Sequence, residues 1–389
     1  MDHYSGEHVD MISHLWLAQP YRCDTFGSSS YATNTLAFHG AGGIITGSAD
    51  HKCRYYRQLA GYGDFALVSE MDMGIGNIHS VQSLTDRHAL CAGYAAPYLQ
   101  VWNGSTGSLT PWLGHTGQVL ATEYSPSMGV VASVSGDRSL LLWSYALTAD
   151  DTLVGKLRTA VDPSGGSPGQ CLAFGSAHLF SGSADRTVKC WDVATGQQLH
   201  CWGGHRSEIK SIAAASDSNM LLSGSEDGEL RIWDTRCATL ALTLNPKAGR
   251  IRAICANECF VCIGTTQPAI QFWDYRFGKN SGCLKGHKSY LSDLKMDNHA
   301  RLLISCGLDG RSNAWQFGVS EEETNVQVAA DDGIEMGMGE DTDLQQRHHS
   351  RKRRRGGGDE LREAGNRRAY REQHPWSVPA LSDQYCVLQ

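Results

Sequence analysis

Alternating apolar and polar positions recur along most of the chain, in pairs of short segments that end on an aromatic residue. Residues 221–234, LLSGSEDGELRIWD, show the unit: an alternating run, a Ser-Gly-Ser stretch, a short turn and a second alternating run. This pattern predicts two antiparallel strands joined by a tight turn. The aromatic position recurs at spacings of 46, 41, 48, 42, 40 and 42 residues, at Tyr56, Trp102, Trp143, Trp191, Trp233, Trp273 and Trp315. The chain therefore contains seven copies of one strand-rich unit.

Two dipeptides mark individual repeats. Trp-Asp stands at the aromatic position of three repeats, and Gly-His stands about 28 residues ahead of it in three, with the His at positions 115, 205 and 287. Over roughly residues 15–317 the chain resembles the WD40 family through these motifs. The resemblance implies an all-β fold, a seven-bladed WD40 β-propeller with four antiparallel strands in each blade.

The two ends of the repeat region suggest how the ring closes. The last repeat stops near Trp315 without a fourth strand, whereas the apolar segment 15–21, LWLAQPY, precedes the first repeat and has no partner in it. We expect this segment to complete the last blade. The predicted organisation is an N-terminal extension at 1–14, the propeller at 15–317 and a charged tail at 318–389.

The family resemblance also implies a hydrogen-bonded chain of His, Ser, Asp and Trp inside a blade, which is favourable only when every member is paired. Repeat four keeps Ser, Asp and Trp but lacks the His, and repeats two and six carry Ala96 and Gln267 at the Asp position, so we expect packing to hold those two. Three repeats match in full: His115, Ser133, Asp137 and Trp143; His205, Ser223, Asp227 and Trp233; His287, Ser305, Asp309 and Trp315.

Catalysis and cofactor binding are not expected. Ser, His and Asp resemble a hydrolase triad, but the same trio recurs in three repeats and its Asp holds a turn. Cys259 and Cys262 form a Cys-x-x-Cys without a second ligand pair. Glycine-rich stretches lack the residues and the strand-to-helix context of a phosphate loop. The sequence thus predicts a protein that is not an enzyme and has no cofactor or metal site.

Charge divides the chain into three parts. The net charge is −7, but residues 318–343 hold nine acids and no Lys or Arg, and residues 344–389 hold ten Lys and Arg against five acids. The repeat region keeps about −3, so it is no basic, nucleic-acid-like body. The 13 cysteines of the whole chain lie mostly in strand-like runs and are interpreted as reduced thiols inside the cell. The tail has too few apolar residues to offset the entropy of ordering, and we expect it to be disordered.

Two motifs in the tail give alternative destinations. The basic run RHHSRKRRRGGG at 347–358 is typical of a nuclear-import signal or a nucleic-acid contact. The last four residues, beginning with Cys386, fit a prenylation box, and the basic run would then support binding to anionic lipid. The first interpretation predicts nucleus and cytoplasm, and the second the cytoplasmic face of a membrane.

Two candidate partner surfaces lie on opposite ends of the predicted ring. On the top, Lys210, Arg250 and Arg252 form a candidate basic sector, with Tyr290 as an aromatic anchor. On the bottom we expect Arg236 and Arg276, each the fourth residue of a Trp-Asp-x-Arg motif. Residues 221–236 are similar to the box of WD40 substrate receptors of cullin-4 ubiquitin ligases, which implies a cullin-type adaptor as the partner of these arginines.

Three functions follow from these features. The first is a non-enzymatic scaffold that assembles a multiprotein complex, in its sharpest form a substrate receptor holding the adaptor on one rim and an unidentified target protein on the other. The second is a prenylated scaffold on a membrane surface. The third is a nuclear component of RNA processing or ribosome assembly, in which nucleic acid is the weaker partner.

Overall fold

The computed structural model describes the repeat region apart from a few short stretches. The described residues are 22–27, 29–40, 42–59, 65–161, 169–215, 219–257, 260–297 and 301–317. Segment 15–21, Cys259 and the tail from 318, including the basic run and Cys386, therefore lie outside the described residues. Within the described residues, 28 strands form seven four-stranded antiparallel sheets.

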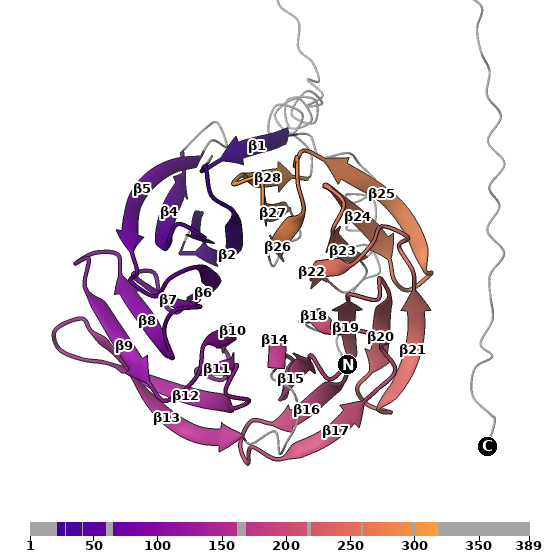
Figure 1. The fold of residues 1–389 in the computed structure, drawn as a ribbon, viewed down its shortest axis with the longest axis horizontal. Helices are drawn as coiled ribbons and strands as arrows, with labels where there is room; N and C mark the ends of the chain where they lie inside the picture. The colour runs from indigo at the N-terminus through magenta and orange to yellow at the C-terminus, as the bar shows by residue number, and fades with distance from the viewer. Residues whose placement is uncertain are drawn as a thin grey trace, which may run out of the picture. The chain divides into compact units, whose positions relative to one another are not determined.

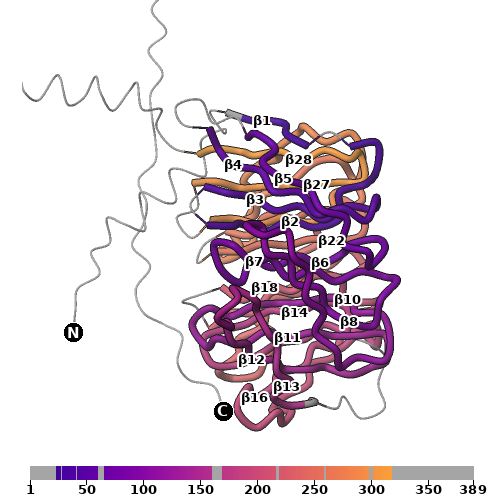
Figure 2. The backbone as a smooth tube through the Cα atoms, turned by 90° about the vertical axis from the view of Figure 1, so that its left-hand side faces the viewer, coloured from indigo at the N-terminus to yellow at the C-terminus, as the bar shows by residue number. Residues whose placement is uncertain are grey.

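The seven sheets stand as blades around a central axis, with the first strand of each blade innermost and the fourth outermost (Figure 1). Seen from the side, they make a disc (Figure 2). Blade 1 holds β2 (Thr33–His39), β3 (Gly43–Ser48), β4 (Lys52–Gln58) and β5 (Phe65–Asp72). Blade 2 holds β6 (Ile78–Ser83), β7 (His88–Gly93), β8 (Tyr98–Asn103) and β9 (Leu109–Leu113). Blade 3 holds β10 (Val119–Ser125), β11 (Val130–Ser135), β12 (Leu140–Leu147) and β13 (Leu153–Val161).

The remaining blades repeat this plan, and the last one combines both ends of the repeat region. Blade 4 holds β14 (Gly169–Phe174), β15 (His178–Ser183), β16 (Val188–Asp192) and β17 (Gln198–Trp202). Blade 5 holds β18 (Ile209–Ala214), β19 (Met220–Ser225), β20 (Leu230–Asp234) and β21 (Thr239–Leu244). Blade 6 holds β22 (Ile251–Ala256), β23 (Phe260–Thr265), β24 (Ala269–Asp274) and β25 (Lys279–Lys285). Blade 7 holds β26 (Leu291–Met296), β27 (Leu302–Gly307), β28 (Ser312–Gln316) and β1 (Arg22–Phe26).

The seven-bladed, all-β prediction is confirmed, and each repeating aromatic residue lies on the third strand of its blade. The core is divided among the spaces between neighbouring blades. Trp233 of blade 5, for example, packs with Phe180 and Trp202 of blade 4. Both faces of a blade are thus buried by its neighbours, which is why the second strands are buried along their whole length in several blades.

Ring closure uses a different segment from the one that the sequence suggested. The strand paired with β28 is β1, with Cys23 opposite Trp315, rather than residues 15–21. Phe26 at the end of β1 is buried and packs on Tyr56 and Phe65 of blade 1, with ring centroids 5.1 and 4.8 Å away. The expected segment contains Pro20, which has no N–H to donate to a ladder. The closing strand therefore also fastens blade 7 to blade 1.

This assignment predicts the outcome of two truncations. Removal of residues 1–21 should leave the thermal unfolding temperature nearly unchanged, because β1 stays intact. Removal of residues 1–27 should lower it strongly, since loss of the Phe26 contacts alone corresponds to about 3–5 kcal/mol of unfolding free energy. Circular dichroism melts check both, and a large loss of stability from the shorter truncation would contradict the assignment.

Candidate functional site

The blades present two rims to a partner. The top rim comprises the loops that lead into each first strand and the turns between second and third strands. The bottom rim comprises the turns between first and second strands and the connections from third to fourth strands. Every blade runs antiparallel in the same order, so equivalent residues of different blades emerge on the same rim.

Blade 5 shows how buried polar groups hold a top-rim turn in place. His205 enters from the loop before β18; its Nδ1 lies 3.0 Å from the Asp227 carboxylate and its Nε2 lies 2.8 Å from Ser223 Oγ. Trp233 Nε1 donates to the same Ser223 oxygen at 2.8 Å. Because a carboxylate only accepts, Nδ1 donates to Asp227 and Nε2 accepts from the serine hydroxyl. The four predicted residues form one continuous hydrogen-bonded chain.

The structure also brings together the corresponding sets of blades 7 and 3. His287 lies 2.8 Å from Ser305 Oγ and 3.2 Å from Asp309, and Trp315 donates to Ser305 at 2.9 Å.

In blade 3, His115 contacts Ser133 at 2.7 Å and Trp143 donates to Ser133 at 2.8 Å. There Ser139 stands between the histidine and the aspartate, at 2.8 Å from His115 Nδ1 and 2.6 Å from Asp137. Sequence spacing alone did not indicate this fifth member.

The electrostatics of the blade 5 chain favour a neutral imidazole and an ionised carboxylate. Burial lowers the pKa of His205, and the Asp227 carboxylate only partly reverses that shift. Burial alone would raise the pKa of Asp227. Hydrogen bonds from the backbone N–H groups of Arg206 and Glu229 and from the imidazole of His205 lower the pKa by more than burial raises it, so the net shift is downward. The carboxylate is therefore charged and fully hydrogen-bonded at neutral pH.

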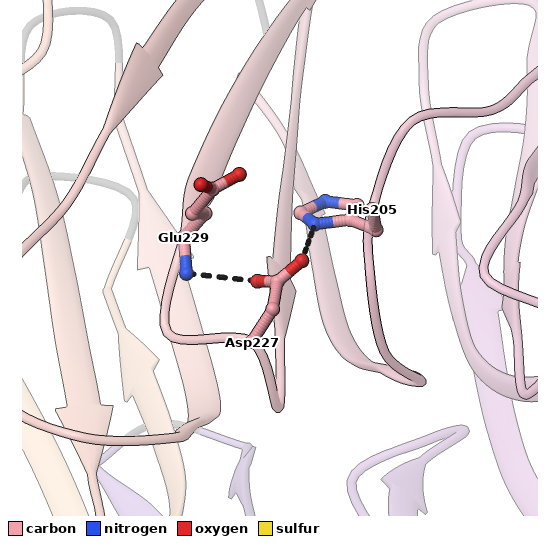
Figure 3. A group of neighbouring side chains, drawn as sticks. All are labelled: His205, Asp227 and Glu229. Atoms are coloured by element: carbon pink, nitrogen blue, oxygen red, sulfur yellow. Dashed lines mark hydrogen bonds and ion pairs between the residues drawn. The ribbon is translucent and has the colours of Figure 1, made fainter.

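His205, Asp227 and Glu229 are also a group whose ligand atoms lie within 4.8 Å of one another (Figure 3). Their polar atoms are already paired, however: one Asp227 oxygen accepts from His205 and the other from the Glu229 backbone N–H. The Glu229 carboxylate points away from Asp227 (Figure 3) and accepts from Arg231 at 3.0 Å. These contacts, together with the buried Ser223 hydroxyl, hold the turn in place.

The blades with incomplete sets use other contacts. In blade 4, Trp191 still donates to Ser181 at 2.8 Å. In blade 6, Trp273 donates to Gln271 at 3.0 Å. In blade 2, Trp102 Nε1 is buried without a hydrogen-bond partner. Blade 2 thus lacks the internal chain, as its Ala96 predicted, but it is not held by packing alone.

A hairpin from blade 3 fastens blade 2 at the bottom rim. Strands β12 and β13 are longer than their counterparts, and the turn between them carries Asp151. The Asp151 carbonyl accepts from His88 Nε2 at 3.0 Å and from Asn103 Nδ2 at 2.9 Å, both in blade 2. The Asp151 carboxylate also lies 3.5 Å from Arg87. The turn therefore replaces the missing internal contacts with contacts from a neighbouring blade.

Trp112 of blade 2 completes this attachment. Its Nε1 donates to the Leu153 carbonyl at 3.1 Å, and its ring stacks on Tyr145 with centroids 6.3 Å apart. Gly155 on β13 leaves the room that this indole occupies, because a Cβ atom there would overlap the Trp112 ring. The hairpin and the fourth strand of blade 2 thus interlock.

The predicted basic sector of the top rim has mixed charge in the structure. Lys210 pairs with Glu208 at 2.5 Å, while Arg250 and Arg252 lie 3.4 and 3.6 Å from Glu226 on the turn of blade 5. Lys210 and Arg252 line the mouth of the central channel. Deeper in the channel, Lys295 of blade 7 lies 3.9 Å from Glu123 of blade 3, and this carboxylate raises the pKa of Lys295. Each cation of the sector thus faces a carboxylate, which reduces the positive potential.

The two bottom-rim arginines occupy equivalent positions in neighbouring blades. Arg236 forms two hydrogen bonds with Asp234, at 3.2 and 2.8 Å, and Arg276 forms two with Asp274, at 3.2 and 2.9 Å. The Arg236 side chain is 65% exposed and that of Arg276 is 34% exposed. Both are therefore oriented by the aspartate of their own Trp-Asp motif, and Arg236 still presents much of its side chain to solvent.

Fold and repeated polar chain together define a β-propeller built from Trp-containing repeats, and comparison with known proteins identifies the family. Residues 106–144, 169–192, 196–234 and 278–316 match the family model described as WD domain, G-beta repeat. The chain belongs to the WD40-repeat family. The matched stretches cover most of blades 3, 4, 5 and 7, which are the blades where a buried serine accepts from the repeat tryptophan.

The names of proteins similar to this chain refer to several cellular processes. An Arabidopsis thaliana protein named Autophagy-related protein 16 is 24% identical over 71% of this chain and 54% of its own length. Nuclear distribution protein PAC1 of Arthroderma otae is 26% identical over 60% and 57%, respectively. Pre-mRNA-splicing factor cwf17 of Schizosaccharomyces pombe is 29% identical over 46% and 52%. The chain thus spans about half the length of these curated relatives.

In the part of the chain that the structure describes, no helix is long and apolar enough to cross a bilayer.

The shared serine predicts unequal effects of one substitution in two blades. Ser223→Ala leaves Trp233 Nε1 and His205 Nε2 without a hydrogen-bond partner and should lower the unfolding free energy by about 2–4 kcal/mol. Ser181→Ala in blade 4 removes the bond to Trp191 alone and should lower it by roughly half as much. Denaturant unfolding of both variants measures the difference, and equal losses would show that the histidine bond contributes nothing.

Acid should weaken the fold below about pH 6.5. Burial lowers the pKa of His115, His205 and His287, and it lowers that of His79 to about 4. Because the unfolded chain binds these protons more readily, their contribution is present above pH 6.5 and falls as pH drops towards the pKa of each folded group. For His79 the slope approaches about 1.4 kcal/mol per pH unit between these limits. His79→Gln should reduce this slope between pH 6.5 and 4 without disturbing a serine–tryptophan bond. Melting temperatures measured from pH 8 to 4 check this, and a flat profile for the unmodified protein would refute it.

Proposed function

We propose that this WD40 protein is a non-enzymatic scaffold that holds at least two protein partners at once. The observation that carries the proposal is the arrangement of its polar residues. Inside the blades, polar groups brace turns, whereas exposed arginine and aromatic side chains stand on two opposite rims of the ring. A rigid body with two separate contact faces raises the effective concentration of one partner near the other.

The names of the relatives are compatible with such a role. They concern autophagy, nuclear distribution and pre-mRNA splicing, three processes without a common reaction. The alignments cover 71, 60 and 46% of this chain, respectively. A role in assembling protein complexes fits all three better than any single chemistry.

The sharpest form of the proposal is a substrate receptor of a cullin-4-type ubiquitin ligase. The bottom rim at Arg236 and Arg276 would bind the adaptor, and the top rim around Lys210, Arg250, Arg252 and Tyr290 would capture the target. Two oriented guanidiniums on adjacent blades suit bidentate recognition of carboxylates or carbonyls on an adaptor. Support comes from the shared position of the two motifs and from the exposure of Arg236.

Charge reversal distinguishes a docking role of these arginines from a bracing role. The double variant Arg236→Glu and Arg276→Glu should reduce co-purification of the adaptor about tenfold or more. Thermal stability should change little, because ion pairs with an exposed member contribute little. The double variant Lys156→Glu and Arg158→Glu on the outer strand of blade 3 is the matched control, since it makes the same charge change at two exposed positions. Unaltered adaptor recovery would reject the ligase form, and loss of folding would identify the arginines as internal braces.

A further inference from the structure

Large apolar side chains are exposed on one part of the top rim. Tyr31, Tyr94, Tyr290 and Leu308 are 58, 50, 48 and 44% exposed. We call these four residues the aromatic arc. Among the described residues, the other exposed large hydrophobic side chains lie on outer strands or on the bottom rim, so the top rim concentrates its apolar surface on blades 7, 1 and 2. Aromatic groups in such positions dominate the energetics of many protein interfaces.

Hydrogen bonds hold the loops that carry the aromatic arc. On blade 7 the Leu308 N–H donates to the Tyr290 carbonyl at 3.0 Å. The loop before Tyr31 is joined to the same blade by the Ser29 N–H, which donates to the Gly310 carbonyl at 2.9 Å.

The other end of the arc is held in the same way. The Tyr94 N–H donates to the Asn77 carbonyl at 3.0 Å, and the Asn34 side chain of blade 1 donates to that of Asn77 at 2.6 Å. The Tyr94 ring also contacts His79, with centroids 3.8 Å apart. A platform fixed in this manner loses little conformational freedom when a partner binds.

Charge differs between the arc and the neighbouring sector. On blades 5 and 6, Lys210, Arg250 and Arg252 face carboxylates of the same rim. Lys288, which is exposed, and Arg311, which is half-buried, flank the arc on blade 7, and within the described residues neither side chain has an ion pair. The aspartate between them, Asp309, already accepts from the backbone N–H groups of both residues and from His287. The blade 7 end of the arc therefore offers cationic groups to an external carboxylate.

We propose that the aromatic arc binds an extended acidic segment of another protein. An apolar side chain of that segment lies on Tyr290 and Leu308, and an adjacent aspartate or glutamate lies beside Lys288 and Arg311. This inference rests on the proposed scaffold function and names the chemistry of the partner at one rim. It places the main contact on blades 7, 1 and 2 rather than on the charge-paired sector of blades 5 and 6.

A protein segment fits this surface better than nucleic acid does. Tyrosines and lysines are suited to stacked bases and phosphates, but Glu208 and Glu226 stand on the same rim, and the repeat region carries about −3. A polyanion would cross these carboxylates, whereas a short segment with one or two acids would avoid them. Competition by single-stranded RNA is therefore a separate outcome of the test.

The experiment uses the full chain and a display library of random peptides as the probe. Enriched peptides should share an apolar residue close to an Asp or Glu. Tyr290→Ala and Leu308→Ser should each weaken a selected peptide about tenfold or more, because truncating an interface anchor commonly has that effect. Lys288→Glu should weaken it several-fold, and added salt should reduce this difference. Phe277→Ala is the matched control, since Phe277 is 78% exposed on the bottom rim.

Each result has one meaning. Peptides that bind equally well to Tyr290→Ala and Leu308→Ser would place the contact elsewhere and overturn the inference while leaving the scaffold function intact. Failure to enrich any acidic peptide would also overturn it. So would a competition result in which single-stranded RNA displaces the selected peptide but an excess of peptide with reversed charge does not. Melting temperatures close to that of the unmodified protein establish that the variants are folded. The scaffold function is tested independently by affinity purification of the full chain from cells, which fails only if no protein partner is recovered.

Discussion

No blade of this protein can bury both of its faces alone, and the rest of the structure depends on that constraint. Each four-stranded sheet is apolar on two sides, so it becomes stable only when two neighbours cover it. The clusters of buried residues accordingly lie between blades, as in the packing of Trp202 and Trp233. The same constraint requires the ring to close, and β1 supplies the closure by joining blade 7 and placing Phe26 against blade 1.

Two different devices hold the blades at their rims. In blades 3, 5 and 7 a buried histidine, serine, aspartate and tryptophan connect the top loop to the sheet. Every polar group of this four-residue set has a hydrogen-bond partner. Blade 2 has no such chain, and its fixation comes from outside, through the Asp151 turn and the Trp112 indole. The first device is local in sequence and the second depends on a neighbour. Divergence of blade 2 from the family pattern therefore need not make it looser, because the long hairpin of blade 3 compensates for it.

Sequence reasoning was reliable for features that repeat and weaker for features that occur once. The period of the aromatic residues predicted seven blades, and the positions of His205, Ser223, Asp227 and Trp233 predicted a chain that the structure brings within hydrogen-bond distance. Sequence reasoning misplaced the closing strand because the five residues of β1 lack the Ser-Gly-Ser stretch that marks the strands of the repeats. The hairpin did leave a signal, since Trp143 is followed by Ser144 instead of Asp and the interval to Trp191 is the longest of the six. The pairing of Arg250 with Glu226 joins two blades, and only the three-dimensional arrangement of the ring reveals it.

The distribution of satisfied and unsatisfied groups also indicates where recognition is plausible. A side chain already oriented by a partner of its own chain, such as Arg276 with Asp274 or Lys210 with Glu208, must keep or exchange that partner when another molecule binds. Exchanging one ionic partner for another costs the free energy of desolvating the new partner, and the new ion pair recovers only part of that free energy. Such groups therefore contribute more to the orientation of a bound molecule than to its affinity. Exposed aromatic side chains on braced loops have no such competing partner and release water when they are covered. On the top rim those side chains belong to blades 7, 1 and 2, two of which the family pattern describes least well. Tyr290 and Leu308 stand on blade 7, whose internal polar chain is complete, whereas Tyr31 and Tyr94 stand on blades outside the matched stretches. The contact surface thus joins one blade with the repeated internal framework to two blades that diverge from the family pattern.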